Sequence, residues 1–493
     1  MKQNINLSIN KLQISDSLMI YGTGMIGKAV YMKLCLLGLK LNVEGFIVSQ
    51  KDNEEYCMGI RIYSIDELCE EPMIIIAVTN KNLSGIMENL KAKKYSRYIY
   101  ANEILDNECK YVIEGYELQQ KEIEYCESEE KKEGNGKTAA HITYPMQGNA
   151  GDTMLSKCVR RLFDRETAIK NWDLYNVSTA VSDKIIDEIN HKDVLIIGGG
   201  GLLLPDTNKN DISGWQWAIS DKQIEKIKIP IIIYAIGYNY FKGQARTRLF
   251  EENIKILIDK AKFIGMRNNG SVNVIKEMLP DRLKDKIVYQ PCPTTVINKI
   301  FDIPPKKSQK KIAVNVAFDR LEKRFESHNI LLILDEIAQA IKEISIWGYK
   351  IILVLHCNSD SIFSLFLNHR NIDYEIVNLS YSLPNEIIQF YNETELTIGM
   401  RGHSQMIPFG VNGRILSLVT HQKMKWFLED IDAEDWCVNV SDDLGNIKNA
   451  ILQKFMTINI IASQSVDDKI ISQKEKLWEI TLKNNRVLND IIK

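Results

Sequence analysis

The sequence has no long hydrophobic run and no excess of charge of either sign. Its longest apolar stretches, such as 73–78, have the length of a strand, whereas a membrane-spanning helix needs about 20 apolar residues. Lysine and arginine number 62 and aspartate and glutamate 64, so the net charge is −2. A chain with this balance has no field that attracts nucleic acid or an anionic membrane. We therefore expect a protein without transmembrane segments and without nucleic-acid partners, in which any anion is bound locally.

Paired cysteines and histidine clusters are also missing. The nine cysteines are scattered singly, without a C-x-x-C pair, and the seven histidines show no spacing typical of zinc ligands. We expect no metal site and reduced thiols. The segment 1–13 lacks the apolar core of a signal peptide. These absences favour a cytoplasmic location, and association with a membrane through a partner stays open.

Short runs rich in isoleucine and valine alternate with helical patterns along almost the whole chain, which is typical of parallel sheets covered by helices. The predicted fold class is therefore α/β. Because 493 residues are too many for one core, we expect two facing Rossmann-like domains, the GT-B-like arrangement of many glycosyltransferases, preceded by a smaller Rossmann-like domain. The expected boundaries are 1–113 for the first domain, 114–138 for a charged linker, and 139–305 and 306–493 for the two lobes.

A dinucleotide-type fingerprint marks the first domain. Gly22, Gly24 and Gly27 follow a strand-like run in the pattern G-x-G-x-x-G, which makes them candidate cofactor-binding residues. The second strand-like run, 43–49, ends without the carboxylate that a ribose needs. The segment 59–68 resembles the N-terminal nucleotide-sugar-binding domain of some sugar acyltransferases. Binding of NAD, of a nucleotide or nucleotide sugar, and a purely structural role all stay open.

The first of three further loops is Gly148-Asn149-Ala150-Gly151-Asp152, which lies between a strand-like run and a helical pattern. Asp152 is thus expected near a helix N-terminus, where an acidic side chain caps the helix or where a ligand meets free N–H groups. Asn149 belongs to the same loop, and both residues are candidates for substrate binding.

The second loop begins with four glycines, Gly198 to Gly201, directly after the apolar run 193–197. Each glycine costs backbone entropy and adds no side chain to a core. A tight turn needs one or two glycines, whereas four favour a backbone that an anion or a sugar approaches closely. We therefore expect the strand to end at 197 and Gly199, Gly200 and Gly201 to contact substrate. Asp206, just beyond, is a helix cap or a contact for an acceptor hydroxyl.

Arginines follow two further strand-like runs. Arg267 comes directly after the run 263–266, and Arg401 lies in the third loop, Gly399-Met400-Arg401-Gly402-His403-Ser404. A guanidinium at such a place anchors a loop or binds a carboxylate or phosphate. Two arginines from opposite lobes suit a small molecule with two anionic groups.

His403 and Lys423 complete the set of candidates. His403 follows a strand end and a glycine rather than an amphipathic stripe, which favours a catalytic or donor-binding role over packing. Lys423 is either a third cation at the anion site or a solvated lysine at a helix end. His356 and His421 also border strand-like runs, where packing is favoured over a place in a cleft.

The order of these loops, Gly-Asn-x-Gly-Asp, Gly-Gly-Gly-Gly-Leu-Leu and Gly-x-Arg-x-His-Ser, resembles that of the polysaccharide pyruvyl transferase family over about 140–430. The resemblance implies that phosphoenolpyruvate is the donor and that its pyruvyl unit becomes a ketal across two hydroxyls of a cell-surface polysaccharide or its precursor. It implies an acceptor that is a glycan, a lipid-linked sugar or a nucleotide sugar, donor contacts from Arg267, Arg401 and His403, and no required cofactor. Protonation of the enol carbon would create an oxocarbenium-like centre for a hydroxyl to attack, with His403 as general acid or phosphate contact.

Two alternatives stay open. A glycosyltransferase of the same two-lobed fold would bind a nucleotide sugar in the cleft between the lobes, and Glu395 and Glu429 are candidates for its ribose contact. A non-catalytic glycan-assembly protein would bind ligand only at its first domain.

Overall fold

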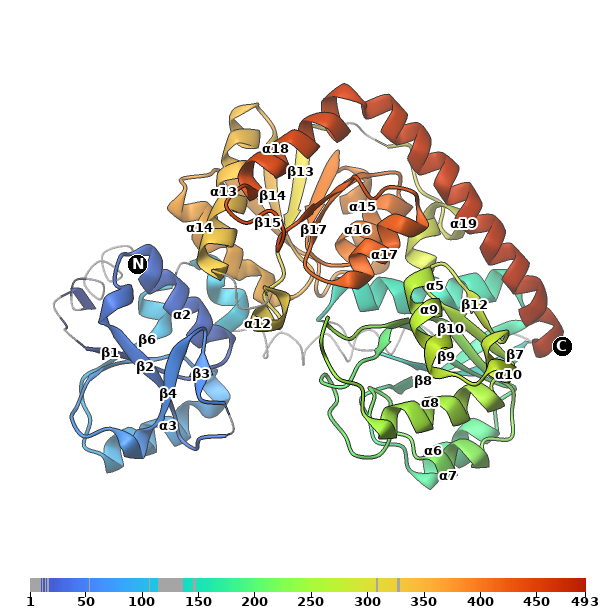
Figure 1. Cartoon of the computed structure of the whole chain (residues 1–493), viewed down its shortest axis with the longest axis horizontal. Coiled ribbons are helices and arrows are strands. Elements are labelled where there is room, and N and C mark those ends of the chain that lie inside the picture. The colour runs from blue at the N-terminus through green and yellow to red at the C-terminus, as the bar shows by residue number, and fades with distance from the viewer. Residues whose placement is uncertain are drawn as a thin grey trace.

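The computed structural model describes residues 10, 12–13, 15, 17–52, 54–105, 107–113, 136–144, 148–306, 309–325 and 329–493. Most of the predicted linker, 114–135, lies outside the described residues, so this assignment and the exact domain boundaries stay predictions. The described chain forms three six-stranded sheets covered by helices (Figure 1). All strand pairs are parallel except one hairpin in the first sheet, and the predicted α/β class is therefore confirmed.

The first sheet has the order β3-β4-β2-β1-β5-β6, and α2 and α3 are its longer helices. The order of the strands along the chain reverses between β1 and β5, which are neighbours in the sheet. The elements are β1 Leu18–Tyr21, α2 Met25–Leu36, η1 Lys40–Asn42, β2 Val43–Val48, β3 Tyr56–Cys57, β4 Ile60–Ser64, η2 Ile65–Glu67, β5 Met73–Ile76, α3 Asn80–Ala92, β6 Tyr98–Tyr100, η3 Ala101–Glu103 and η4 Asn107–Cys109.

The second sheet has the order β12-β11-β10-β9-β7-β8. Its central strands β9 and β10 are buried almost throughout, which explains why they read as continuous apolar runs rather than alternating ones. The elements are β7 Lys137–Thr143, α5 Ala150–Glu166, β8 Ile169–Asn176, α6 Asp183–Asn190, β9 Val194–Leu203, α7 Asp221–Lys226, β10 Ile231–Tyr238, α8 Arg248–Lys260, β11 Phe263–Met266, α9 Asn269–Met278, α10 Asp281–Lys284, β12 Ile287–Tyr289, η5 Pro293–Val296 and α11 Ile297–Ile300.

The third sheet has the order β15-β14-β13-β16-β17-β18, in which β13 and β16 are neighbours at the point where the chain reverses direction. Its last strand, β18, was not among the strands expected from the sequence. The elements are β13 Lys311–Asn315, α12 Leu321–Arg324, α13 Ile330–Ile346, β14 Lys350–Leu355, η6 Asn358–Phe363, α14 Ser364–His369, β15 Tyr374–Asn378, α15 Pro384–Asn392, β16 Leu396–Gly399, α16 His403–Gly410, β17 Arg414–Val419, α17 Gln422–Asp430, β18 Cys437–Asn439, α18 Ile447–Met456, η7 Thr457–Ile461 and α19 Ser463–Ile492.

The glycine run lies within a strand, which corrects the expectation that the strand ends at 197. Strand β9 continues to Leu203, and Gly199 and Gly200 adopt φ values of 77° and 118° inside it. A Cβ on Gly198 would lie 2.2 Å from the carbonyl oxygen of Tyr234, and one on Gly199 would lie 2.8 Å from Leu155. Much of the run is therefore explained by close packing of β9 against β10 and α5.

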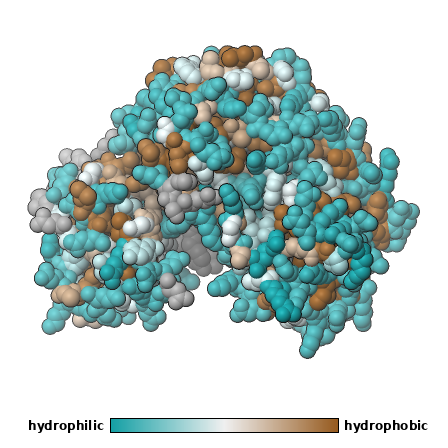
Figure 2. Space-filling view, viewed as in Figure 1, coloured by the Kyte–Doolittle hydropathy of each residue, from teal (hydrophilic) through white to brown (hydrophobic). Residues whose placement is uncertain are grey.

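The second and third sheets belong to two facing lobes, and the last helix joins them. Helix α19 leaves the third-sheet lobe and ends beside the second-sheet lobe (Figure 1). There the side chain of Asn484 donates to the carbonyl of Tyr289 and to Oε1 of Gln290, both at 2.9 Å. Polar side chains cover most of the face shown in Figure 2. No helix within the described ranges is both long and apolar enough to cross a bilayer.

Candidate active site

A cavity of about 460 Å³ lies between the two lobes. It sits where parallel α/β sheets usually bind ligands, beyond the carboxyl ends of strands at the point where strand order reverses. In the second sheet this point lies between β7 and β9, which lead to Tyr144 and Leu204. In the third sheet it lies between β13 and β16, which lead to Asp319 and Arg401.

The structure brings nine of the ten residues predicted for substrate binding and catalysis into this one cavity. They are Asn149, Asp152, Gly199, Gly201, Asp206, Arg267, Arg401, His403 and Lys423. Gly200 is not among the lining residues, although both of its neighbours are. The roles assigned to these residues stay predictions.

Arg267 presents an unpaired guanidinium. The side chain extends from the end of β11 and is only 6 % exposed, and its Nε has no hydrogen-bond partner. Within the part of the chain that the structure describes, this side chain forms no hydrogen bond or ion pair. Burial lowers its pKa. Burying a charge without a partner costs free energy, and an anion that binds beside the charge offsets this cost.

Two glycines make room for this arginine. A Cβ on Gly237 would lie 2.3 Å from Nε of Arg267, and one on Gly201 would lie 3.1 Å from Nη2. The last glycine of the run therefore has a role at the site that the others lack, since it lets the guanidinium lie against the backbone.

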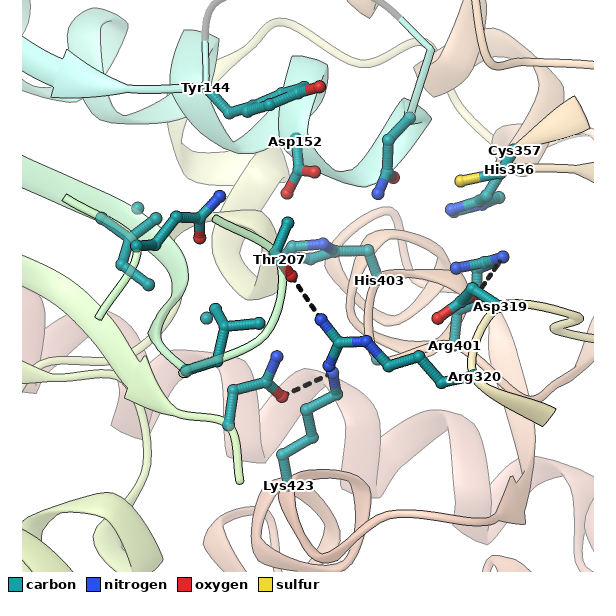
Figure 3. Close-up of a pocket in the computed structure, with 18 of the residues that line it drawn as sticks. Tyr144, Asp152, Thr207, Asp319, Arg320, His356, Cys357, Arg401, His403 and Lys423 are labelled. Carbon is teal, nitrogen blue, oxygen red and sulfur yellow. Dashed lines mark hydrogen bonds and ion pairs between the residues drawn. The ribbon is translucent and has the colours of Figure 1, made fainter. Parts of the chain in front are cut away.

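Lys423 is the second cation without a carboxylate at hydrogen-bond distance. Its ammonium group donates to Oδ1 of Asn239 at 2.7 Å, which links α17 of one lobe to the end of β10 in the other (Figure 3). Burial, together with the charges of Arg267 and Arg324, lowers the pKa of Lys423 well below its usual range. An anion entering the cavity would favour the charged form of this lysine.

Arg401, in contrast, is already neutralised by two carboxylates. Its Nη2 lies 2.6 Å from Oδ1 of Asp360 and 2.6 Å from Oδ1 of Asp319. Burial opposes ionisation of Asp319, but the charges of Arg324 and Arg401 outweigh it and hold the pKa of this carboxyl well below its usual range. The uncompensated positive charge at the site therefore belongs to Arg267 and Lys423, and not to Arg401, the other arginine that the sequence singled out.

His403 is the first residue of α16 and lies against the N-terminal turn of α5. A Cβ on Gly151 would lie 2.3 Å from Nδ1 of His403, so only glycine fits there. Nε2 lies 3.9 Å from Sγ of Cys292. Burial, followed by the charges of Arg267, His356 and Lys423, lowers the pKa of His403 well below its usual range. The imidazole is thus neutral and accepts protons or hydrogen bonds from a ligand.

The Gly-Asn-Ala-Gly-Asp loop joins the lobes. The backbone N–H of Gly148 donates to the carbonyl of Ser380 at 2.8 Å, and that of Ala150 donates to the carbonyl of His356 at 3.0 Å. Asn149 is the helix cap, since its Oδ1 accepts from the backbone N–H of Gly151 at 2.9 Å. Asp152 lies in the first turn and points into the cavity (Figure 3).

Asp206 forms ion pairs across the cleft. Its Oδ1 lies 3.0 Å from Nη2 of Arg320 and its Oδ2 lies 2.5 Å from Nζ of Lys323. Arg320 also donates to the hydroxyl of Thr207 (Figure 3) and lies over the ring of Phe241. Asp206 is not followed by a helix, so the alternative of a helix cap is wrong, and its paired carboxylate closes one side of the cavity.

The fingerprint glycines of the first domain do not belong to this cavity, whose described lining residues all come from the other two sheets. A Cβ on Gly22 would lie 2.6 Å from the carbonyl oxygen of Ala77, and one on Gly27 would lie 1.9 Å from that of Gly22. Both are therefore explained by packing. Gly24 has open space around it. Binding of a nucleotide or nucleotide sugar at this loop stays a prediction.

Sequence reasoning did not assign several polar residues of the site, among them Asn239, Asp319 and Arg320, and it favoured packing for His356, which also lines the cavity. Asn239 directly follows β10, His356 directly follows β14, and Asp319 lies four residues beyond β13. Polar residues after strands of parallel sheets are a signal that would have found them. Within the described ranges, no group of three or more histidine, cysteine or acidic side chains is placed to hold a metal ion.

Fold and site together define a two-lobed α/β protein whose inter-lobe cavity contains unpaired cations beside a neutral histidine. The family model described as polysaccharide pyruvyl transferase matches residues 94–414, well over half of the chain. The chain belongs to the polysaccharide pyruvyl transferase family. Among curated proteins, no sequence is significantly similar to it.

Several solved structures are similar over long stretches at low identity. The MnaA–UDP complex from S. aureus is 12 % identical, with 68 % of this chain and 90 % of that chain covered and a TM-score of 0.41. UDP-GlcNAc 2-epimerase from Methanocaldococcus jannaschii, in complex with UDP-GlcNAc and UDP, is 14 % identical, with 66 % and 92 % covered and a TM-score of 0.39. The wall teichoic acid polymerase TagF is 11 % identical, with 78 % and 95 % covered and a TM-score of 0.39. These neighbours carry no argument about the reaction.

Proposed function

We propose that the protein transfers the pyruvyl group of phosphoenolpyruvate to two hydroxyls of a sugar in a polysaccharide or its precursor, forming a ketal. Membership of the family supports the reaction class. The observation that carries the choice of donor is the unpaired guanidinium of Arg267 beside Lys423, because phosphoenolpyruvate carries a phosphate and a carboxylate. A small molecule with two anionic groups compensates both cations, neither of which has a carboxylate at hydrogen-bond distance among the described residues.

The site residues then have distinct tasks. Arg267 and Lys423 bind the donor anion and stabilise the phosphate as it leaves. His403 contacts the phosphate or the reacting hydroxyl as a neutral imidazole. Arg401, clamped by Asp319 and Asp360, shapes the cavity beneath the donor. The acceptor enters where Tyr144 and the loop after β9 line the opening.

Calorimetry with phosphoenolpyruvate tests the donor. We expect the wild type to bind it and the Arg267→Met variant to bind about 10- to 100-fold more weakly, since hydrogen bonds to charged groups contribute about 1.5–3 kcal/mol. The same variant should be at least as stable as the wild type without ligand, because it removes an unpaired buried charge. Arg282→Met, which removes an exposed arginine of the same lobe paired with Asp259, is the control and should bind normally.

Turnover is measured as phosphate released from phosphoenolpyruvate in the presence of a panel of lipid-linked and nucleotide sugars. Absence of phosphoenolpyruvate binding, together with nucleotide-sugar binding that Arg267→Met weakens, would replace the proposal with a glycosyltransferase. Absence of both ligands from the cavity would leave a non-catalytic glycan-assembly protein.

A further inference from the structure

One carboxylate of the cavity differs from the others. Asp319 pairs with Arg401 and Arg324, and Asp206 pairs with Arg320 and Lys323. Asp152 lines the same cavity, but within the described part of the chain its carboxylate forms no hydrogen bond and no ion pair. Figure 3 shows it pointing toward the space above His403. A carboxylate that lines a cavity and has no hydrogen-bond partner has no structural task that explains it.

The surroundings of Asp152 favour proton exchange. Burial raises its pKa, against the charges of Arg267, Lys423 and Arg401, and the negative charge of Asp319 adds to the rise. Tyr144 and Cys357, whose own pKa values are raised by burial, also face it. A bound trianionic phosphoenolpyruvate would occupy the nearby cations and favour the protonated carboxyl further.

His403 has the opposite tendency, since burial and the neighbouring cations lower its pKa and keep the imidazole neutral. Two neighbouring titratable groups whose environments shift them in opposite directions are typical of a divided acid and base assignment. A neutral imidazole has no spare proton with which to start a reaction by protonating carbon, whereas a protonated carboxyl does. The carboxyl of Asp152 is therefore a better candidate for the acid step of the transfer than His403, which the sequence favoured.

We propose that Asp152 is the catalytic residue that carries a proton from the first acceptor hydroxyl to the enol carbon of the donor. This inference rests on the proposed function. The protonated carboxyl of Asp152 gives its proton to C3 of phosphoenolpyruvate, and C2 becomes oxocarbenium-like. The first sugar hydroxyl attacks C2, a C–O bond forms, and its proton passes to the carboxylate of Asp152, which is thereby restored.

The second half of the reaction uses His403. The bond between C2 and the phosphate oxygen breaks, and Arg267 and Lys423 stabilise the departing phosphate. The second sugar hydroxyl then attacks C2, and His403 passes its proton to the phosphate, which leaves as hydrogen phosphate. At the pyruvyl unit two C–O bonds and one C–H bond have formed, while the π bond between C2 and C3 and the C–O bond to the phosphate have broken. One hydroxyl proton is now on C3 and the other on the phosphate, and both side chains have regained their initial protonation states.

Proton uptake on binding of phosphoenolpyruvate tests this assignment without the acceptor. Calorimetric titrations at pH 8 in buffers of different ionisation enthalpy give the number of protons taken up per bound donor. We expect Asp152→Asn to bind phosphoenolpyruvate at least as well as the wild type and to take up fewer protons, by as much as one. Asp206→Asn, which removes a paired carboxylate of the same cavity, should leave the number per bound donor unchanged.

Activity supplies the second measurement. Phosphate release with the acceptor panel should fall about 100-fold or more in Asp152→Asn, as expected for loss of a general acid–base group, and Asp152→Glu should restore part of it together with the proton uptake. Equal proton uptake in the wild type and in the Asn and Glu variants, or turnover of Asp152→Asn within about threefold of the wild type, overturns the inference while leaving the donor assignment intact. A wild type that does not bind phosphoenolpyruvate overturns the proposed function itself.

Discussion

At the scale of single residues, the site is built by side chains that lie against glycines. Gly151 lies under His403, and Gly201 and Gly237 lie under Arg267. Because a Cβ at any of these places would come within about 3 Å of the functional side chain, these glycines set its position directly. They lie in three different elements, and only one of them belongs to the conspicuous run of four.

The Gly151→Ala substitution should displace the imidazole of His403 and lower turnover about tenfold or more, since small misplacements of reacting groups are costly. The protein should stay folded, because alanine has a higher helix propensity than glycine. Gly85→Ala, in the exposed face of α3 with nothing within 4 Å of the new Cβ, is the matched control and should keep full activity. Turnover of Gly151→Ala equal to that of the control, measured as phosphate release, contradicts the assignment of His403.

At the scale of elements, the short helix α12 links all three parts of the molecule. Arg320, just before it, has a left-handed φ of 56° and pairs with Asp206 of the facing lobe. Glu322, on the helix, pairs with Lys28 of the first domain at 2.7 Å. An arginine in a left-handed conformation costs about 1 kcal/mol, and its contacts with Asp206, Thr207 and Phe241 offset this cost.

The Asp206→Asn substitution should weaken this contact between the lobes. Partly exposed ion pairs contribute at most about 1 kcal/mol each, so amide hydrogen exchange in 204–210 and 319–324 should become about 3- to 10-fold faster. Asp183→Asn removes the exposed pair with Lys226 within one lobe and should leave exchange in both segments unchanged. Equal exchange rates for Asp206→Asn and Asp183→Asn in these two segments would show that the Asp206 ion pairs do not hold the lobes together.

At the scale of the whole molecule, a second contact between the lobes responds to pH. Asn269, at the start of α9, donates its side-chain amide to Oδ1 of Asp430 at 2.8 Å. Burial raises the pKa of Asp430 to about 7, against hydrogen bonds from Asn269 and Tyr289, and the nearby Glu429 adds to the rise. An aspartate of the unfolded chain has a pKa of about 3.9.

Between about pH 4 and pH 7 the folded protein therefore binds more protons at this position than the unfolded chain does. The free energy of unfolding falls as the pH rises through this window and stays lowered above it. Asp430→Asn removes the ionisation, so its Tm should exceed that of the wild type at pH 8, by about 2 °C or more, and by less at pH 5. The exposed Asp435→Asn is the control. A gain in Tm from Asp430→Asn that is the same at pH 5 and at pH 8 would contradict the assigned ionisation of Asp430.

The predictable part of the fold is local in the sequence. Strand 263–266 is a short apolar run bounded by polar residues, and the structure confirms it with the same bounds. Strand β9 was predicted too short because a glycine run is typical of a loop, yet packing against β10 and α5 keeps it extended. Strand β18, Cys437–Asn439, was missed because Val438 is its only β-branched or aromatic residue.

The amino-acid order alone was enough to place nine residues around one cavity, because residues that follow parallel strands gather at one edge of a sheet. It was not enough to show which charges stay free. Arg401 meets carboxylates 41 and 82 positions away along the chain, Asp360 and Asp319, while Arg267 meets none. Pairing depends on distances between elements that only the folded chain brings together, so the difference between a clamped arginine and an available one appears only in three dimensions.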